Sequence, residues 1–176
     1  MTKLSLDCTL HNRTLRITRG EEQTLILQDT ITKSRSIVLT IALEERAFVS
    51  VQGRFRVRGD ATLALDITVV HEGYMSVSRI DVRAVAYDTA RVVSIGRVVI
   101  PLTSGVDAAQ YSRILLVGDR ASGRAEPIIE VEAQDVVCKH GSAVAPIPSE
   151  EIIFLRSRGI SLVRARELFI DAFLVQ

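Results

Sequence analysis

The sequence predicts an all-β domain followed by two short helices. Apolar residues make up 47% of the 176 residues and aromatic residues only 5%, so the apolar content is aliphatic, which favours strands. Through residues 1–147, apolar and polar residues alternate with the period of two that half-buried strands require. Helical spacing begins only after Ser149. We therefore expect a β domain over residues 1–147 and a helical hairpin over residues 148–176.

Five stretches show the alternation most clearly, and short turn-like sequences separate them. The stretches are residues 4–10, 37–43, 49–57, 63–69 and 80–86. The expected breaks are Arg19-Gly20, Gly53, Gly59-Asp60, Glu72-Gly73, Ser104-Gly105 and Ser122-Gly123. Many short strands fit a sandwich, a barrel or a β-solenoid. No strict sequence repeat chooses among them.

Two amphipathic helices are expected at the C-terminal end. Ser149 is a natural N-cap, and the two glutamates after it suit the positive end of the helix dipole. Gly159 is expected to end the first helix and Ser161 to cap the second. Apolar residues of the second helix recur at steps of three and four. They are Leu162, Ala165, Leu168, Phe169, Ala172 and Phe173. Such a short hairpin must dock on the β domain, on a partner, or on both.

Bulk properties exclude several classes of function. The 22 basic and 21 acidic residues leave a net charge of +1, which gives no field for steering nucleic acid or anionic lipid. Apolar runs stop at four residues, far short of a membrane span or a signal peptide. We therefore expect a soluble cytoplasmic protein whose cysteines stay reduced. The sequence contains no nucleophile elbow, phosphate-binding glycine loop or His-Glu-x-x-His motif, so it is not expected to be an enzyme.

Cys138 and His140 form the one pair of residues that suggests metal chemistry. At positions i and i+2 of a strand, their side chains project from the same face. A thiolate and an imidazole in this arrangement suit one iron atom or one cluster edge. Clusters are usually held by four ligands, so a second copy or a partner must supply the rest. The alternative interpretation is a buried, structural Cys138 beside a hydrogen-bonded His140.

The sequence around this pair closely resembles the SufB/SufD family, the scaffold subunits of SUF iron–sulfur cluster assembly. The resemblance covers residues 71–174 well, beginning at His71-Glu72-Gly73, and covers residues 1–70 only by general strand character. The cysteine that SufB proteins use for cluster building would fall near Ser112, and the glutamate after the family's histidine is Gly141. The chain therefore resembles a short SufD more than a SufB, without the family's usual N-terminal region.

This resemblance implies a right-handed parallel β-helix with a C-terminal two-helix hairpin. It also implies a scaffold role, with a transient iron–sulfur cluster at Cys138 and His140 on a dimer seam. The implied partners are a SufC-like ABC ATPase and either a second copy or a SufB-like protein. The residues expected to contact the ATPase are Ser149, Glu150, Ile153, Phe154, Leu155, Arg156, Arg158, Gly159 and Ile160.

Two alternatives and several further residues stay open. The chain could keep the ATPase contact as an interaction subunit without binding metal, or it could be a polysaccharide enzyme, although its acids form no distinctive pair. Asp135, with Glu130 and Glu132, is either an additional iron ligand or part of a solvated face. His71 is interpreted as structural and Cys8 as core packing. The stripe of Arg54, Arg56 and Arg58 is interpreted as a solvated basic ridge.

Overall fold

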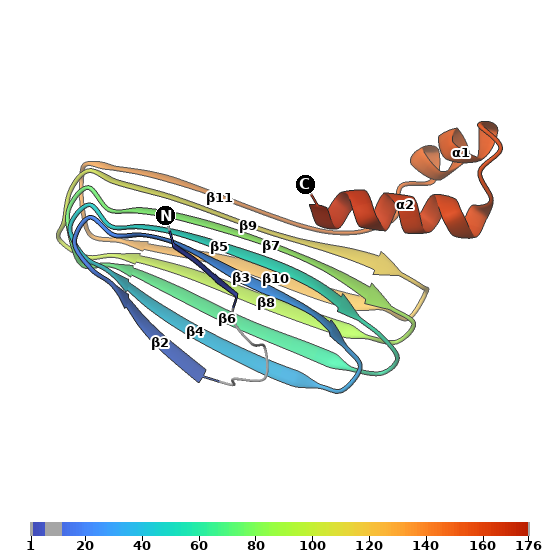
Figure 1. Cartoon of the computed structure of the whole chain (residues 1–176), viewed down its shortest axis with the longest axis horizontal. Coiled ribbons are helices and arrows are strands. Elements are labelled where there is room, and N and C mark those ends of the chain that lie inside the picture. The colour runs from blue at the N-terminus through green and yellow to red at the C-terminus, as the bar shows by residue number, and fades with distance from the viewer. Residues whose placement is uncertain (1, 6–11, 176) are drawn as a thin grey trace.

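The computed structural model describes residues 2–5 and 12–175, which form eleven strands followed by two helices (Figure 1). The strands are β1 (Thr2–Ser5), β2 (Asn12–Ile17), β3 (Glu22–Ile31), β4 (Arg35–Leu43), β5 (Phe48–Val57), β6 (Thr62–His71), β7 (Val77–Tyr87), β8 (Arg91–Ile100), β9 (Val106–Val117), β10 (Ser122–Val131) and β11 (Val136–Pro146). The helices are α1 (Ser149–Ser157) and α2 (Leu162–Val175).

The strands wind into a parallel β-helix. Odd-numbered strands form a six-stranded sheet in the order β1-β3-β5-β7-β9-β11, and even-numbered strands form a five-stranded sheet in the order β10-β8-β6-β4-β2. Each strand pairs in parallel with the strand two positions along the chain, so one coil contains one strand of each sheet. Figure 1 shows the two sheets running in opposite directions. The predicted all-β solenoid is therefore confirmed, and the sandwich and barrel are excluded.

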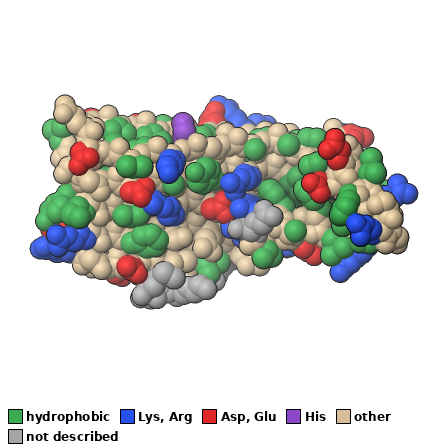
Figure 2. All heavy atoms as spheres, turned by 90° about the horizontal axis from the view of Figure 1, so that it is seen from above, with side chains coloured by type: hydrophobic (Ala, Val, Ile, Leu, Met, Phe, Trp, Pro, Cys, Tyr) green, Lys and Arg blue, Asp and Glu red, His purple; other side chains and the backbone are tan. Residues whose placement is uncertain are grey.

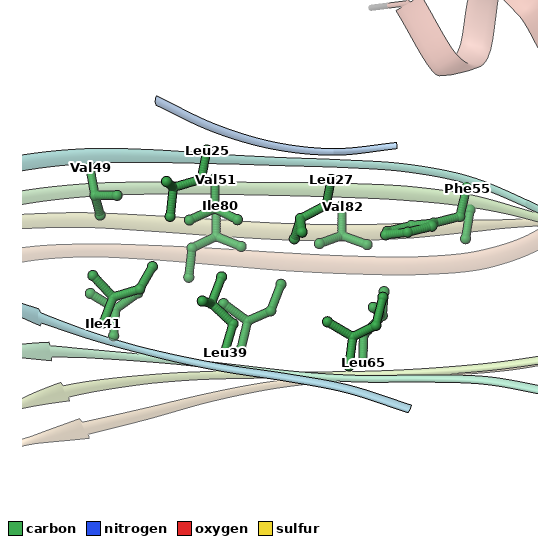
Figure 3. Packing of buried hydrophobic residues seen from close by; sticks show 14 of the residues in the cluster. Leu25, Leu27, Leu39, Ile41, Val49, Val51, Phe55, Leu65, Ile80 and Val82 are labelled. Carbon is green, nitrogen blue, oxygen red and sulfur yellow. The ribbon is translucent and has the colours of Figure 1, made fainter. Parts of the chain in front are cut away.

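An aliphatic core fills the space between the two sheets. Leu25, Val51 and Ile80 are in register on successive strands of the larger sheet and face the smaller one (Figure 3). Leu39 lies opposite them on the smaller sheet, and Leu65 lies further along the core, opposite Val82 (Figure 3). Fully burying one such side chain contributes roughly 1.5–3 kcal/mol. The period of two in the sequence thus arises because successive side chains of each strand point alternately into this core and toward the outer surface.

Four of the six expected breaks lie between strands, including Glu72-Gly73, and three of these four have a glycine in the left-handed region. Gly20, Gly59 and Gly105 have φ angles of 71°, 69° and 67°. The break expected at Gly53 is wrong, because this residue lies inside β5. A Cβ there would lie 3.1 Å from Cε2 of Phe55, so the glycine makes room for a core aromatic ring. The break expected at Ser122-Gly123 is also misplaced, because β10 begins there.

The expected first strand, over residues 4–10, overlaps the described residues only at its beginning. Thr2–Ser5 form β1, which pairs with β3. Cys8 and His11 lie outside the described residues, so the core role predicted for Cys8 stays a prediction.

The helix ends follow the sequence signals with one exception. Ser161 Oγ accepts a hydrogen bond from the Arg164 N–H at 3.4 Å, as expected of a cap. Gly159 ends α1 with a φ of 82°. The capping role expected of Ser149 is wrong, because α1 already includes this residue and its N-cap is Pro148, with no side-chain cap hydrogen bond. Proline suits this position because its fixed φ matches the observed −60°.

The second helix packs on the outer face of the larger sheet. Ile170 and Leu174 form a separate apolar cluster with Val85, Tyr87 and Leu115. Two arginines of the sheet hold the same helix. Arg83 Nη1 donates a hydrogen bond to the carbonyl oxygen of Phe173 at 2.8 Å. Arg56 forms an ion pair with Asp171 at 2.5 Å. Within the described residues, neither helix has the length and apolar character needed to cross a membrane.

Candidate functional site

The last coil of the β-helix presents open strand edges. β11 ends the larger sheet, and β10 ends the smaller one. β11 pairs with β9 along its whole length, and none of the described strands pairs with its other edge. Most of its side chains are exposed. A parallel strand with a free row of N–H and C=O groups is suited to pairing with another chain.

Cys138 and His140 lie in phase on this edge strand. Cys138 is in register with Ala108, and His140 with Gln110. Ala108 and Gln110 are buried inward-facing residues of β9, so the pair lies on the inward side of β11. Cys138 is half-buried and packs against the aliphatic core, whereas His140 is exposed. The thiol and the imidazole therefore lie together where the core meets the open end.

The Cys138 thiol is not activated in the isolated chain. Burial raises its pKa above the usual value, and the carboxylate of Asp107 on β9 raises it further. The thiolate, not the thiol, binds metals and attacks sulfur. A metal that binds here must therefore release a proton, so binding strengthens as pH rises.

The described residues do not complete a metal site around this pair. None of their histidine, cysteine and acidic side chains come together in a group of three or more that could hold a metal ion. Glu130, one expected oxygen ligand, forms an ion pair with Arg97. Glu132 and Asp135 are exposed in the turn between β10 and β11. An iron–sulfur cluster needs more ligands than one copy of these residues offers.

His71 is a structural residue, in agreement with the sequence interpretation. It is fully buried, and its ring nitrogens lie 2.8 Å from Ser76 Oγ and 2.9 Å from Ser78 Oγ. Ser76 donates its own hydrogen to the Gly73 carbonyl oxygen, so it accepts the proton of Nδ1 and leaves Nε2 to accept from Ser78. Burial lowers the pKa of His71 to about 4. The ring is therefore neutral at physiological pH.

The basic ridge does not offer free cations. Arg54 pairs with Asp81 at 2.6 Å, and Arg56 is the partner of α2 already described. The guanidinium of Arg58 lies 4.1 Å from the centre of the Tyr87 ring. The interpretation as a solvated ridge is therefore wrong for Arg54 and Arg56, which are half-buried and ion-paired, whereas Arg58 is exposed.

The helical hairpin exposes apolar side chains on α1. Ile153 is 65% exposed and Phe154 is 56% exposed, and the Arg158 guanidinium lies 5.2 Å from the centre of the Phe154 ring. Figure 2 shows hydrophobic side chains at the surface of the end that carries the helices, mixed with charged ones. Of the other residues expected to contact a partner, Leu155 and Ile160 are half-buried. The rest are exposed, namely Ser149, Glu150, Arg156, Arg158 and Gly159.

Sequence reasoning missed part of this apolar surface. Val163, at the start of α2, is 75% exposed, and Leu162 beside it is also exposed. Ile152, in contrast, is buried. The apolar face predicted for α2 is partly wrong, because it included the exposed Leu162 and Ala172. It also omitted Ile170 and Leu174, which are buried.

Comparisons with known proteins identify the family of this chain. The family described as SUF system FeS cluster assembly, SufBD core domain, matches residues 11–173. The chain is 40% identical over 67 residues to the iron–sulfur cluster assembly protein SufD of Escherichia coli, which covers 38% of this chain and 16% of that protein. It is 31% identical over 119 residues to SufD of Bacillus subtilis, covering 66% and 27%. A SufBD family protein of Synechocystis is 32% identical over 92 residues, covering 52% and 20%. The chain thus spans about a quarter or less of these relatives.

Proposed function

The chain belongs to the SufBD core family of the SUF system, and we propose that it is a scaffold subunit of iron–sulfur cluster assembly. The observation that carries this proposal is the open last coil, where Cys138 and His140 lie in phase on an unpaired edge strand. In this role the chain dimerises through that edge and binds an ABC-type ATPase through its helical hairpin. The cluster is the cargo of the scaffold.

Dimerisation supplies the missing ligands. A second copy that meets the first at β10 and β11 brings another cysteine and another histidine to the seam. Two thiolates and two imidazoles match a ligand set that proteins use for [2Fe–2S] clusters. A SufB-like partner would supply its own ligands at the same edge. Separation of the two edges would then let iron and sulfur enter or leave.

The hairpin is placed to transmit movement of an ATPase to this seam. The exposed Ile153 and Phe154 offer apolar contacts on α1, while α2 is anchored to β7 and β9 through Val85 and Leu115. β9 is the direct neighbour of β11. A displacement of the hairpin is therefore carried to the strand next to the seam.

Substitution of Ile153 and Phe154 by aspartate is expected to abolish ATPase binding. Charges at the centre of an apolar contact typically cost at least 2 kcal/mol, which is more than a tenfold loss of affinity. The measurement is anaerobic co-purification with the ABC ATPase of the same organism. A truncation after Pro148 is less informative, because it would also uncover Val85 and Leu115.

The matched control is Val175→Asp, at the far end of α2, where the side chain is 84% exposed. This variant is expected to keep the ATPase. Equal retention of the ATPase by the double aspartate variant and the wild type would refute the docking role of α1.

Replacement of Cys138 by serine is expected to remove most of the cluster formed on anaerobic reconstitution with iron and sulfide. Serine preserves the size of the side chain but is a poor ligand for these clusters, which thiolates hold. The readout is the visible absorbance of the reconstituted protein, with Cys8→Ser as the control because it removes the only other thiol. Undiminished absorbance in the Cys138 variant, or a loss in the Cys8 variant alone, would contradict the assignment.

A second candidate function is an interaction subunit that contacts the ATPase without holding a cluster. The raised pKa of Cys138 and the incomplete ligand set among the described residues favour it. Iron and sulfide analysis of the complex purified without oxygen separates the two functions. Stoichiometric iron and sulfide support the scaffold, and their absence from an intact complex supports the interaction subunit.

A further inference from the structure

The interior of the β-helix changes from aliphatic to polar in its last coils. One inward-facing row of the larger sheet reads Leu25, Val51, Ile80, Gln110 and His140, each in register with the next. The first three residues are the aliphatic core of Figure 3. Gln110 is still 97% buried, because only 3% of its surface is exposed. A polar amide therefore occupies a core position.

Only half of the Gln110 amide is satisfied by the protein. Its Nε2 donates to the carbonyl oxygen of Ile128 on β10 at 3.0 Å. This contact fixes the orientation of the amide, because a carbonyl only accepts and must face the NH₂ group. The other atom, Oε1, is buried and finds no hydrogen-bond donor among the described protein groups. It points toward Gly96 on β8, where a Cβ would lie only 2.7 Å away.

Two buried serines stand beside this amide. Ser112, two residues after Gln110 on the same inward face, donates to Ser94 Oγ on β8 at 3.0 Å. A pair of hydroxyl groups that share one hydrogen bond has a second hydrogen left to donate, whichever serine holds it. Gln110, Gly96 and both serines line a cavity of about 10 Å³. Its remaining walls include Ile67, Ile80, Val82 and Pro127.

We propose that this cavity is a binding site for a single buried water molecule. The water donates one hydrogen to Gln110 Oε1 and accepts the spare hydrogen of the Ser94–Ser112 pair, which provides the two or more polar partners that buried waters have. This volume reaches the lower end of the roughly 10–15 Å³ that one buried water molecule needs. The lining residues carry no charge, so an ion has no counter-charge here. The role is to satisfy the amide carbonyl, which is otherwise costly to bury.

The water site lies close to the open end of the β-helix. Gln110 is in register with His140, and Ser112 with Ser142, so the water lies one strand away from the open edge. The polar interior thus begins one coil inside the protein and continues to the edge strand. Because the bound water satisfies the side-chain carbonyl of Gln110, β11 can cover this polar interior without leaving a buried acceptor unpaired. This inference does not depend on metal or ATPase binding.

The test is the number of long-lived water molecules, measured by magnetic relaxation dispersion of the water oxygen nucleus. Gln110→Met preserves side-chain length and removes the acceptor, so this variant is expected to hold one such water fewer than the wild type. Gln52→Met, at an exposed outward position of β5, is the matched control and is expected to leave the number unchanged. An unchanged number in the Gln110 variant would overturn the proposal.

A crystal structure of the wild type tests the same site without any substitution. The expected result is a density peak within hydrogen-bond distance of both Gln110 Oε1 and Ser94 Oγ or Ser112 Oγ. Absence of the peak, with Oε1 bonded to a protein donor instead, would refute the water site even if the methionine variant failed to fold.

Discussion

Replacement of Gly73 by alanine is expected to destabilise the protein by more than about 4 kcal/mol, enough to prevent its folding at moderate temperature. A Cβ at this position would lie 2.0 Å from the backbone nitrogen of Glu45 and 2.3 Å from the carbonyl carbon of Glu44. Both atoms belong to the backbone of the turn one coil below. No side-chain rotation relieves such an overlap, so whole turns must separate.

Hydrogen bonds between the stacked turns prevent this separation. The Gly73 N–H donates to the Leu43 carbonyl oxygen at 2.9 Å, and the Arg46 N–H donates to the Tyr74 carbonyl oxygen at 3.0 Å. The turn after β6 therefore lies directly on the turn after β4, and only a hydrogen atom fits at the Gly73 α-carbon.

The measurement is the yield of soluble protein, followed by urea unfolding where the variant folds. Gly59→Ala is the control, because a Cβ there meets nothing within 4 Å and only its φ of 69° opposes the change. That strain costs roughly 1–2 kcal/mol. Similar losses in the two variants would show that the close approach at Gly73 is unimportant.

Local periodicity predicted the strands but not their arrangement. The alternation at residues 63–69 has the same appearance in a sandwich and in a β-helix, because both bury one face of each strand. What distinguishes them is that β4 pairs with β6 and not with β5. No strict repeat reveals this pairing, since a core row such as Leu25, Val51 and Ile80 requires only aliphatic side chains of suitable volume. The family resemblance supplied the arrangement.

Features of the candidate site that depend on the spacing within one strand could be predicted from the sequence. Features that depend on contacts between two strands could not. The common face of Cys138 and His140 follows from their spacing alone. The pKa of Cys138 is raised first by burial and then by Asp107, and both causes depend on the adjacent strand β9, which is far away in the sequence. The interior serine pair and Gln110 likewise required the register between β8, β9 and β10. The role of Gly53 could not be predicted for the same reason. In the sequence it resembles a turn residue, and only the structure shows that it makes room for the ring of Phe55.

Acidification from pH 6.5 to pH 4 is expected to cost the protein about 3 kcal/mol of stability through His71 alone. In the unfolded chain the imidazole has its ordinary pKa of 6.5, whereas burial lowers the pKa to about 4 in the folded protein. Between these values the unfolded chain binds a proton that the folded protein does not. The free energy of unfolding therefore falls by about 1.4 kcal/mol for each pH unit in this window and levels off below it.

The measurement is urea unfolding of the wild type and of His71→Gln at several pH values between 4 and 7.5. Glutamine can bond to Ser76 and Ser78 but does not titrate, so the variant is expected to lose this part of the pH dependence while carboxylates contribute equally to both proteins. Identical slopes for His71→Gln and the wild type would mean that His71 accepts its proton as readily in the folded protein as in the unfolded chain. In that case the hydrogen bonds to the two serines, and not desolvation, would determine the pKa of His71 in the folded protein.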